Sequence, residues 1–486
     1  MNTTVPPHWI HRVTRLLAMA ATVVFLLAGC VSMAPSYQVP SLPVSPSYAS
    51  NTSQKGESAA ALGWRDYFTD PQLQALITLA LDNNRDLRTA VFRVEEARAL
   101  YGIQRAEQFP AIGAQASGDR SRIPGDLNLT GKPLEGSQYR AELGLASWEI
   151  DFWGRVRNLK DRALENYLAT DEARRAGAIA LVAQVANSYL SLRELNERIV
   201  LARRTIASRS ESLRIFTRRV EVGSTSRLNL TEVQTLLTQA QALGAQLELL
   251  RAAQGHALTL LVGAPVDFPF LEKPLDDQAV LVTLRPGLPS DLLIQRPDIL
   301  AAEHQLKATH AHIGAARAAF FPQVTLTGVY GTASAELEGL FASGSQAWIF
   351  SPRLSLPIFD GGRRRNNLDL AEARRDLAVA HYEKTVQSAF RDVADALSAR
   401  HWLAEQSTIA QTALAVQTER ARLSQLRYNN GAAPFLDVLD AQRDLLAAEQ
   451  QSVQIRRALL SSRVNLYAAL GGGAMDVVSP SAPGTP

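Results

Sequence analysis

The feature that most restricts how this chain can fold is an internal repeat. The motifs Asn84–Leu87 and Arg296–Ile299 open similar stretches at an offset of 212 residues, from 84 to 296. Further on the offset is 208, and Gly223 and Gly263 fall on Gly431 and Gly471. Chance identities do not keep one offset over so long a span, so the chain contains two copies of one unit.

Each copy contains a segment suited to a very long helix. Residues 363–430 are 68 residues without Gly or Pro, and the counterpart 155–222 contains only Gly177. Such a helix is about 100 Å long at ~1.5 Å per residue. In the first copy apolar residues recur every seven positions, which predicts left-handed supercoiling against neighbouring helices. They are Val185, Leu192, Ile199, Ile206, Leu213 and Val220.

The row three positions before this stripe starts with Val182 and Tyr189 and then becomes polar. It continues as Asn196, Arg203, Ser210 and Thr217. We therefore expect the packing seam to narrow to one row, with the polar row facing water.

Shorter helices are predicted at about 227–262 and 290–320, on either side of a Pro-rich connection at 265–289. Their combined length is close to that of the long helix, so we expect them to stack end to end and lie antiparallel beside it. The result is a helical hairpin that turns at Gly223, with a second hairpin that turns at Gly431.

Each copy also contains two segments in which apolar and polar residues alternate, the pattern of a strand with one apolar face. Leu143 and Leu145 flank Gly144, for example, and Leu354 and Leu356 flank Ser355. The predicted strands span about 111–121, 138–148, 323–331 and 347–357.

The N-terminus predicts export and lipidation. Arg12 and Arg15 precede an apolar run at 16–29, which is too short to span a bilayer and suits a signal peptide. The run ends in Leu27-Ala28-Gly29-Cys30 and contains the only cysteine of the chain. This resembles the lipobox of bacterial lipoproteins, which implies a signal peptide at 1–29, an N-palmitoyl and S-diacylglycerol group on Cys30, and a lipidated tether at 30–58. The alternative is a plain secretory signal with an incidental cysteine.

Four strands are too few to enclose a membrane pore, because the smallest known membrane barrels have about eight. Open sheet edges are not tolerated in hydrocarbon, since each unpaired backbone group costs several kcal/mol. No segment after residue 30 is apolar enough for a membrane helix, so any crossing there must use strands. The strands are therefore either soluble or shared by several chains, eight in a dimer or twelve in a trimer.

Several motifs carry a family resemblance. They are the Gly-Arg pairs within Asp151–Arg155 and Phe359–Arg363, the turn Tyr428–Gly431 and the stretch Phe435–Arg443. With the lipobox and the repeat, residues 58–472 resemble the outer membrane factor family, in its lipoprotein branch of TolC-like, NodT-type efflux channels. The resemblance implies a mainly α-helical fold with a transmembrane β-barrel portion. A homotrimer would share a twelve-stranded barrel above a periplasmic helical tunnel, with repeats at 59–270 and 271–472 and a flexible tail at 473–486.

The resemblance also implies the function and the partners. The trimer would be the outer membrane exit duct of a tripartite efflux system, coupled through a periplasmic adaptor protein to an inner-membrane pump of the RND type. Inward-facing Arg140, Glu142 and Arg353 would keep the barrel lumen polar.

A periplasmic gate is expected just beyond the second turn. Asp437 and Asp440 are three residues apart and share a helix face, so a trimer would contain rings of three carboxylates that constrict the duct and favour cations. The family's gate residues match Leu436, Asp440 and Arg443 here. The alternative is that these are ordinary exposed charges.

The hairpin turns and their flanks are the predicted adaptor site, although they can equally be mere turn and cap residues. They comprise Arg219, Val220, Gly223, Ser224, Thr225, Arg227, Leu228, Arg427, Tyr428, Gly431, Ala432 and Phe435.

Other classes of function receive little support. His310 and His312 are two apart on a predicted helix and face different sides, and no HExxH, GxSxG or phosphate-binding loop occurs. We therefore expect no enzyme activity, no cofactor and no metal, and the net charge of +3 gives no reason to expect nucleic acid binding. The alternative function is a non-conducting, lipid-anchored periplasmic coiled-coil scaffold.

Overall fold

The structure is a computed structural model that describes residues 32–41, 57–59, 62–272, 284–285 and 295–473, together with residues 44 and 274. The predicted signal peptide, Cys30 and nearly all of the predicted tail lie outside the described residues. The fold comprises two compact units. The strand unit includes Val94–Ala169, Ala302–Tyr382 and the described residues up to Ser41; the hairpin unit includes Thr170–Ala301, Glu383–Gly473 and the described residues of Leu42–Arg93.

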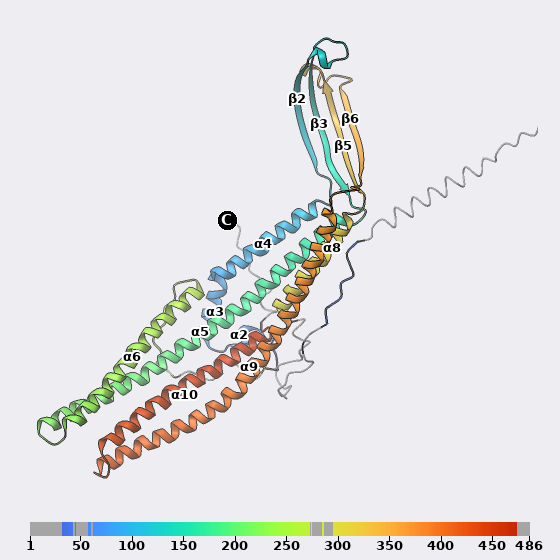
Figure 1. Cartoon of the computed structure of the whole chain (residues 1–486). Helices are drawn as coiled ribbons and strands as arrows, with labels where there is room; N and C mark the ends of the chain where they lie inside the picture. Colours follow the sequence, from blue (N-terminus) through green and yellow to red (C-terminus); the bar gives the residue numbers. More distant parts are fainter. Residues whose placement is uncertain are drawn as a thin grey trace, which may run out of the picture. The chain divides into compact units, whose positions relative to one another are not determined.

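The strand unit contains a four-stranded antiparallel sheet in the order β2-β3-β5-β6 (Figure 1). The strands are β2 (Ile112–Ile123), β3 (Leu134–Ile150), β5 (Gln323–Ser334) and β6 (Gln346–Ser355). The four predicted strands are present, and β3 extends beyond its predicted segment at both ends. The pairing of β3 with β5 shifts register between Leu145 and Trp148, next to Ser147 with its positive φ of 38°.

The sheet has one apolar and one polar face. Residues are assigned to a face from the pairing, since side chains directly opposite each other in paired strands point to the same side. Leu143, Tyr330 and Trp348 lie side by side on one face, and they are 60%, 60% and 70% exposed. Glu142 pairs with Gln115 on the other face, where Thr325 also faces Arg353. Strands β2 and β6 form the two edges of this amphipathic sheet.

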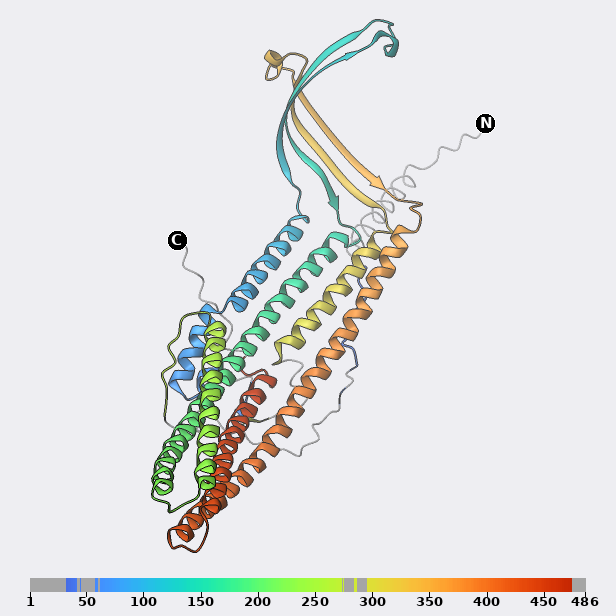
Figure 2. The same cartoon turned by 60° about the vertical axis from the view of Figure 1, so that its left-hand side comes forward.

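The helices reproduce the repeat. α5 (Arg155–Glu221) and α9 (Arg363–Asn429) are uninterrupted helices of 67 residues each, and α6 (Arg227–Val262) and α10 (Phe435–Ala469) follow them. The first residues of these pairs keep the offset of 208. Figures 1 and 2 show α6 beside α5 and α10 beside α9 in the hairpin unit. The remaining α-helices of the described residues are α2 (Trp64–Tyr67), α3 (Pro71–Asn83), α4 (Arg85–Ala106) and α8 (Pro297–Ala318), and β1 (Glu57–Ser58) pairs in parallel with β4 (Leu284–Arg285).

The predicted stacking of the segments 227–262 and 290–320 is wrong. The C-terminus of α6 meets the start of α4, where Asn84 Nδ2 donates to the carbonyl of Leu261 at 2.8 Å. The C-terminus of α10 meets the start of α8 in the same way, and Arg296 Nη1 donates to the carbonyl of Ala469 at 2.9 Å. Helix length could not distinguish these partners, because α4 and α8 both have 22 residues.

The predicted seam of α5 is only partly correct. Val185 and Ile199 of the seven-residue stripe are buried, but Asn196 of the supposed water-facing row is only 1% exposed and accepts a 2.7 Å hydrogen bond from Arg251 Nε. The seam also keeps a second row three positions after the stripe, as heptad packing requires. The members of this row are Leu195, Ala202, Arg209 and Phe216, all at most 8% exposed.

None of the described helices has an apolar stretch long enough to cross a membrane.

A glycine substitution tests the register of the sheet. A Cβ at Gly331 would lie 2.2 Å from the carbonyl oxygen of Ala141, whereas a Cβ at Gly328 would meet its nearest atom at 4.0 Å. We expect Gly331→Ala to destabilise the sheet by about 1–3 kcal/mol through overpacking, and Gly328→Ala to leave it nearly unchanged. Thermal unfolding of the detergent-purified variants measures the difference, and equal unfolding temperatures would contradict this register.

Candidate functional site

The candidate site is built from the two hairpin turns, which have similar backbone geometry. Gly223 and Gly431 have φ of 71° and 69°, the left-handed conformation that ends a helix and that glycine adopts without strain. Ser226 then caps α6 by accepting from the backbone N–H of Asn229 at 3.2 Å. Pro434 stands at the corresponding position before α10. Both turns are therefore short and sharply defined.

An aromatic cluster joins the two hairpins close to their turns. The ring centroids of Phe216 on α5 and Phe435 on α10 are 4.4 Å apart, and those of Tyr428 and Phe435 are 4.9 Å apart. Val233 of α6 and Leu439 of α10 complete its buried part, at 1% and 3% exposure. The first two turns of α6 and α10 are thus held together by packing between the two repeats.

Arg219 adds a polar link to this cluster. Its guanidinium donates to the hydroxyl of Tyr428 in the other repeat and lies 5.4 Å from the centroid of the Phe216 ring. The two predicted turn residues Arg219 and Tyr428 therefore form one latch between the hairpins, which we name the tip latch together with Phe216 and Phe435.

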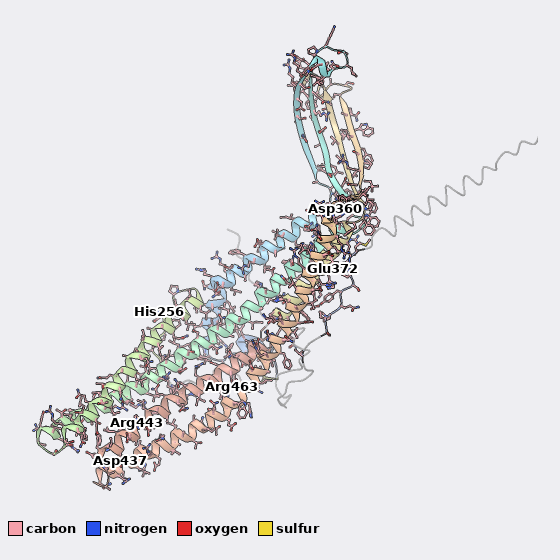
Figure 3. The ribbon with its side chains drawn as sticks, in the orientation of Figure 1. His256, Asp360, Glu372, Asp437, Arg443 and Arg463 are labelled. Atoms are coloured by element: carbon pink, nitrogen blue, oxygen red, sulfur yellow. The ribbon has the colours of Figure 1, made fainter. Side chains whose placement is uncertain are left out.

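Charged residues connect α9 and α10 a little further from the turn. Arg443 forms ion pairs with Asp440 and Asp444, each at 3.2 Å, and Arg420 of α9 pairs with Asp444 at 2.6 Å. The hydrogen bond from Arg420 lowers the pKa of Asp444 below the ordinary aspartate value, with Arg443 acting in the same direction. Figure 3 shows Asp437 and Arg443 on the part of α10 that follows the turn.

The predicted gate carboxylates share one groove. Asp437 and Asp440 line a hollow of about 800 Å³ between α9 and α10, together with Arg420 and Arg427. Leu436 is 48% exposed and Leu228, its repeat counterpart, is 68% exposed. The structure thus places the four predicted gate residues on consecutive turns of one helix, with Asp440 and Arg443 in direct contact.

The other predicted turn residues mainly shape the turns themselves. Ser224 Oγ donates to the carbonyl of Arg219 at 3.1 Å, and Arg427 donates to the carbonyl of Ala432 at 3.3 Å. Thr225 accepts a hydrogen bond from Asn229 at 3.0 Å. Val220, Gly223, Arg227, Gly431 and Ala432 lie beside them on the surface of the turns or partly buried.

Sequence reasoning missed Phe216, Ser226, Arg420 and Asp444. Phe216 was detectable, because it occupies the second heptad row of α5. Ser226 was also detectable as a capping residue immediately before α6. The pair of Arg420 and Asp444 joins two helices and has no spacing that marks it in the sequence.

The N-terminal segment at 32–41 packs on helices of the strand unit. Ser32 Oγ donates to Asn158 Oδ1 of α5 at 2.8 Å, and Tyr37 donates to Glu303 Oε1 of α8 at 3.1 Å. Between them the chain crosses Gly314, where a Cβ would lie 2.7 Å from the backbone nitrogen of Ala34. This part of the predicted tether is therefore a docked strap, which we call the N-terminal strap.

No group of three or more His, Cys, Asp or Glu side chains that could hold a metal ion occurs in the described part of the chain.

An amphipathic sheet with two open edges, joined to two long helical hairpins, defines a channel subunit of TolC-like architecture. Comparison with known proteins supports this architecture. The family model described as outer membrane efflux protein matches residues 76–264 and 288–472, once in each repeat. The chain belongs to the outer membrane efflux protein family.

Similar proteins cover almost the whole chain. The toluene efflux pump outer membrane protein TtgC of Pseudomonas putida is 43% identical over 469 residues, covering 95% of this chain and 96% of TtgC. The outer membrane protein OprJ of Pseudomonas aeruginosa is 43% identical over 459 residues, covering 94% and 95%.

Solved structures share the fold. The open state of the MtrE outer membrane channel of Neisseria gonorrhoeae has a TM-score of 0.84 at 39% identity, covering 91% of this chain and 99% of MtrE. A membrane protein of Pseudomonas aeruginosa has a TM-score of 0.86 at 42% identity, covering 91% and 100%. The predicted family and the TolC-like fold class are confirmed, and the chain is an outer membrane protein that extends into the periplasm.

The pair of Arg420 and Asp444 generates a prediction on pH. The folded-state pKa of Asp444 is lowered, so the pair stabilises the α9–α10 hairpin above the unfolded aspartate pKa of about 4. The contribution is lost as the pH falls through the lowered pKa. We expect the amide protection factors near the start of α10, which correct for the intrinsic exchange rate at each pH, to fall on acidification in the wild type and to be already low at neutral pH in Asp444→Asn. Asp395→Asn, at an exposed aspartate of α9, is the control; identical profiles in all three proteins would contradict the assignment.

The strap generates a second prediction, with its control in the other repeat. Gly314→Ala places a methyl group against Ala34 and should release residues 32–41, so chymotrypsin should cleave after Tyr37 faster than in the wild type. Gly102 is the repeat counterpart of Gly314 and has no atom within 4 Å of an added Cβ. Gly102→Ala should therefore leave cleavage unchanged, and equal rates in both variants would show that the strap does not depend on this contact.

Proposed function

We propose that three copies of this chain form the exit duct of a tripartite efflux system across the outer membrane and into the periplasm. The main support for the proposal is the amphipathic sheet with its two unpaired edges. Its apolar face is strongly exposed, and its edges β2 and β6 each have a free side. In hydrocarbon such edges must be paired, and pairing β6 of one copy with β2 of the next closes a barrel. Three copies give twelve strands.

The helices supply independent support for association. α9 exposes an apolar stripe at seven-residue intervals, formed by Trp402, Ile409, Val416 and Leu423. These side chains are 58%, 60%, 61% and 43% exposed, which is unusual for a helix that stands alone in water. A heptad stripe packs against a neighbouring helix, and the neighbouring copy in a ring offers one.

The competing scaffold function explains the long helices but not the sheet. A non-conducting coiled coil in the periplasm does not require a sheet with a polar face that contains Arg140, Glu142 and Arg353. In a closed barrel these residues would line a water-filled lumen. The family is one of efflux channels rather than enzymes.

The proposed duct implies two protein partners, an adaptor and a pump. An adaptor protein of the periplasm would contact the two turns, where Arg219, Tyr428 and Phe435 form the tip latch. An inner-membrane pump of the RND type would deliver the cargo. Relatives are named for the efflux of toluene and of antibiotics. We propose that the present chain also exports small organic molecules of this kind.

The gate would be formed by the start of α10. Three copies of Asp437, Asp440 and Leu436 around the axis give rings that narrow the duct, and Arg443 fixes Asp440 by their ion pair. Adaptor contacts at the tip latch would favour an open state by their higher affinity for it. Acyl chains on Cys30 would hold the trimer at the membrane, with the N-terminal strap fixing where the anchor leaves the helices.

Conductance in planar bilayers tests the function. The detergent-purified protein should be a trimer and should form ion-conducting channels. A protein that is monomeric in mild detergent, conducts no ions and becomes soluble once Cys30 is replaced would support the scaffold instead.

Removal of a gate carboxylate tests the constriction. Asp440→Ala removes the charge of one ring and one of the two acidic partners of Arg443, so single-channel conductance should rise by about twofold or more, together with passive entry of large antibiotics. Glu211→Ala is the matched control, because Glu211 forms an exposed i,i+3 ion pair with Arg214 on α5. If both variants conduct like the wild type, Asp440 does not line the constriction.

A further inference from the structure

The apolar face of the sheet ends at a defined row. Along β3 the face runs from Ile150 to Tyr139, which opposes Gly118 of β2 and Ser334 of β5. This length is about 35 Å at ~3.4 Å per residue, or about 27 Å across the membrane at the usual tilt of 35–45°, close to the ~25 Å apolar band of membrane barrels. The Tyr139 ring lies against Gly118, where a Cβ would be 3.0 Å from it. A tyrosine at this level marks the interface between hydrocarbon and headgroups.

Two arginines follow on the same face beyond that row. The pairing of β2 with β3 is regular from Ile112 to Ile123, so Arg120 and Arg122 point to the side of Ile112 and Leu143. They lie about 7 and 14 Å beyond the Gly118 row at ~3.4 Å per residue. Their side chains are 79% and 68% exposed. The lipid-facing side of the sheet therefore changes from apolar residues to cations where the headgroups begin.

Ion pairs within the chain do not explain why two arginines lie at this position. Glu135 lies 3.7 Å from Arg120 and 3.5 Å from Arg122, distances that allow ion pairing but exceed those of good hydrogen bonds. One carboxylate also leaves the group with a net positive charge. Exposed ion pairs of this kind contribute little to stability, so two arginines on the lipid-facing side are better explained by a ligand.

We propose that Arg120 and Arg122 bind the phosphate groups of an anionic lipid headgroup in the outer leaflet. Guanidinium groups match phosphate oxygens with paired N–H donors, and the register of β2 with β3 places both arginines on one face of the hairpin. The proposal rests on the proposed function, because the duct orientation sets which leaflet this end of the sheet meets. The end in question carries the β2–β3 and β5–β6 loops (Figure 1), and the opposite end is joined to α4 and α5.

Native mass spectrometry of the purified full-length protein tests the site. Delipidated protein is titrated with bisphosphorylated lipid A, with the same glycolipid after removal of its phosphates, and with inorganic phosphate as competitor. The wild type should bind the phosphorylated lipid, and the double variant Arg120→Ala/Arg122→Ala should bind it at least about tenfold more weakly. Arg140→Ala removes a charge from the opposite face of β3 and should bind like the wild type.

Each outcome decides the question. Equal binding by the double variant and by Arg140→Ala, or equal binding of the dephosphorylated lipid, would overturn the proposal. Displacement by millimolar inorganic phosphate would show a free-anion site instead of a lipid site. Bilayer conductance separates this result from the duct assignment: the double variant should conduct like the wild type, whereas a wild type without conductance would refute the duct and not the lipid measurement.

Discussion

The main constraint on this protein is the cost of leaving backbone hydrogen-bonding groups unpaired in hydrocarbon. The chain folds a sheet of four strands, with an apolar face suited to lipid and a polar face suited to water, but β2 and β6 leave their outer edges unsatisfied. A single copy therefore cannot place this sheet in a bilayer at acceptable free energy. The backbone itself thus supports the proposed association of several copies, and the exposed heptad stripe of α9 suits the helices to the same association.

The helical part solves a different problem, which is to keep a long hairpin together with few large side chains. Its seam on α5 uses two heptad rows, and one of these includes a cation, Arg209, at 4% exposure. Burial lowers the pKa of Arg209, and its Nη1 donates to the carbonyl of Leu236 at 2.5 Å. A buried arginine of this kind adds little to stability, because the cost of desolvating the charge offsets the gain from its hydrogen bond. Near the turn this polar contact gives way to the aromatic packing of Phe216 and Phe435.

Much of the architecture was predictable because the repeat fixes two copies of every element. The offset of 208 located both turns, and alternation in the sequence located the strands of the sheet. Contacts between elements distant in sequence were not predictable. Asn84 and Leu261 are 177 residues apart, and their hydrogen bond lies where α6 and α4 meet. The burial of Asn196 was missed for a similar reason, since its hydrogen-bond donor Arg251 is 55 residues away in the sequence. The strap at Gly314 likewise depends on a close backbone approach that no spacing records.

The two copies of the repeat differ near their turns, where each contributes different side chains. Asp437, Asp440 and Asp444 of the second copy correspond to Asn229, Glu232 and Leu236 of the first. Phe216 in turn corresponds to Ser424, and Tyr428 to Val220. The two turns therefore contribute different groups: the first contributes Phe216 and Arg219 to the latch, and the second contributes Tyr428, Phe435 and the aspartates. In a ring of three chains, six similar hairpins would then alternate in kind: three carry Asp437, Asp440 and Asp444, whereas the other three carry only Glu232 at these positions. A stimulus at the latch would act on both kinds at once, because the latch is the place where side chains of the two copies touch near their turns.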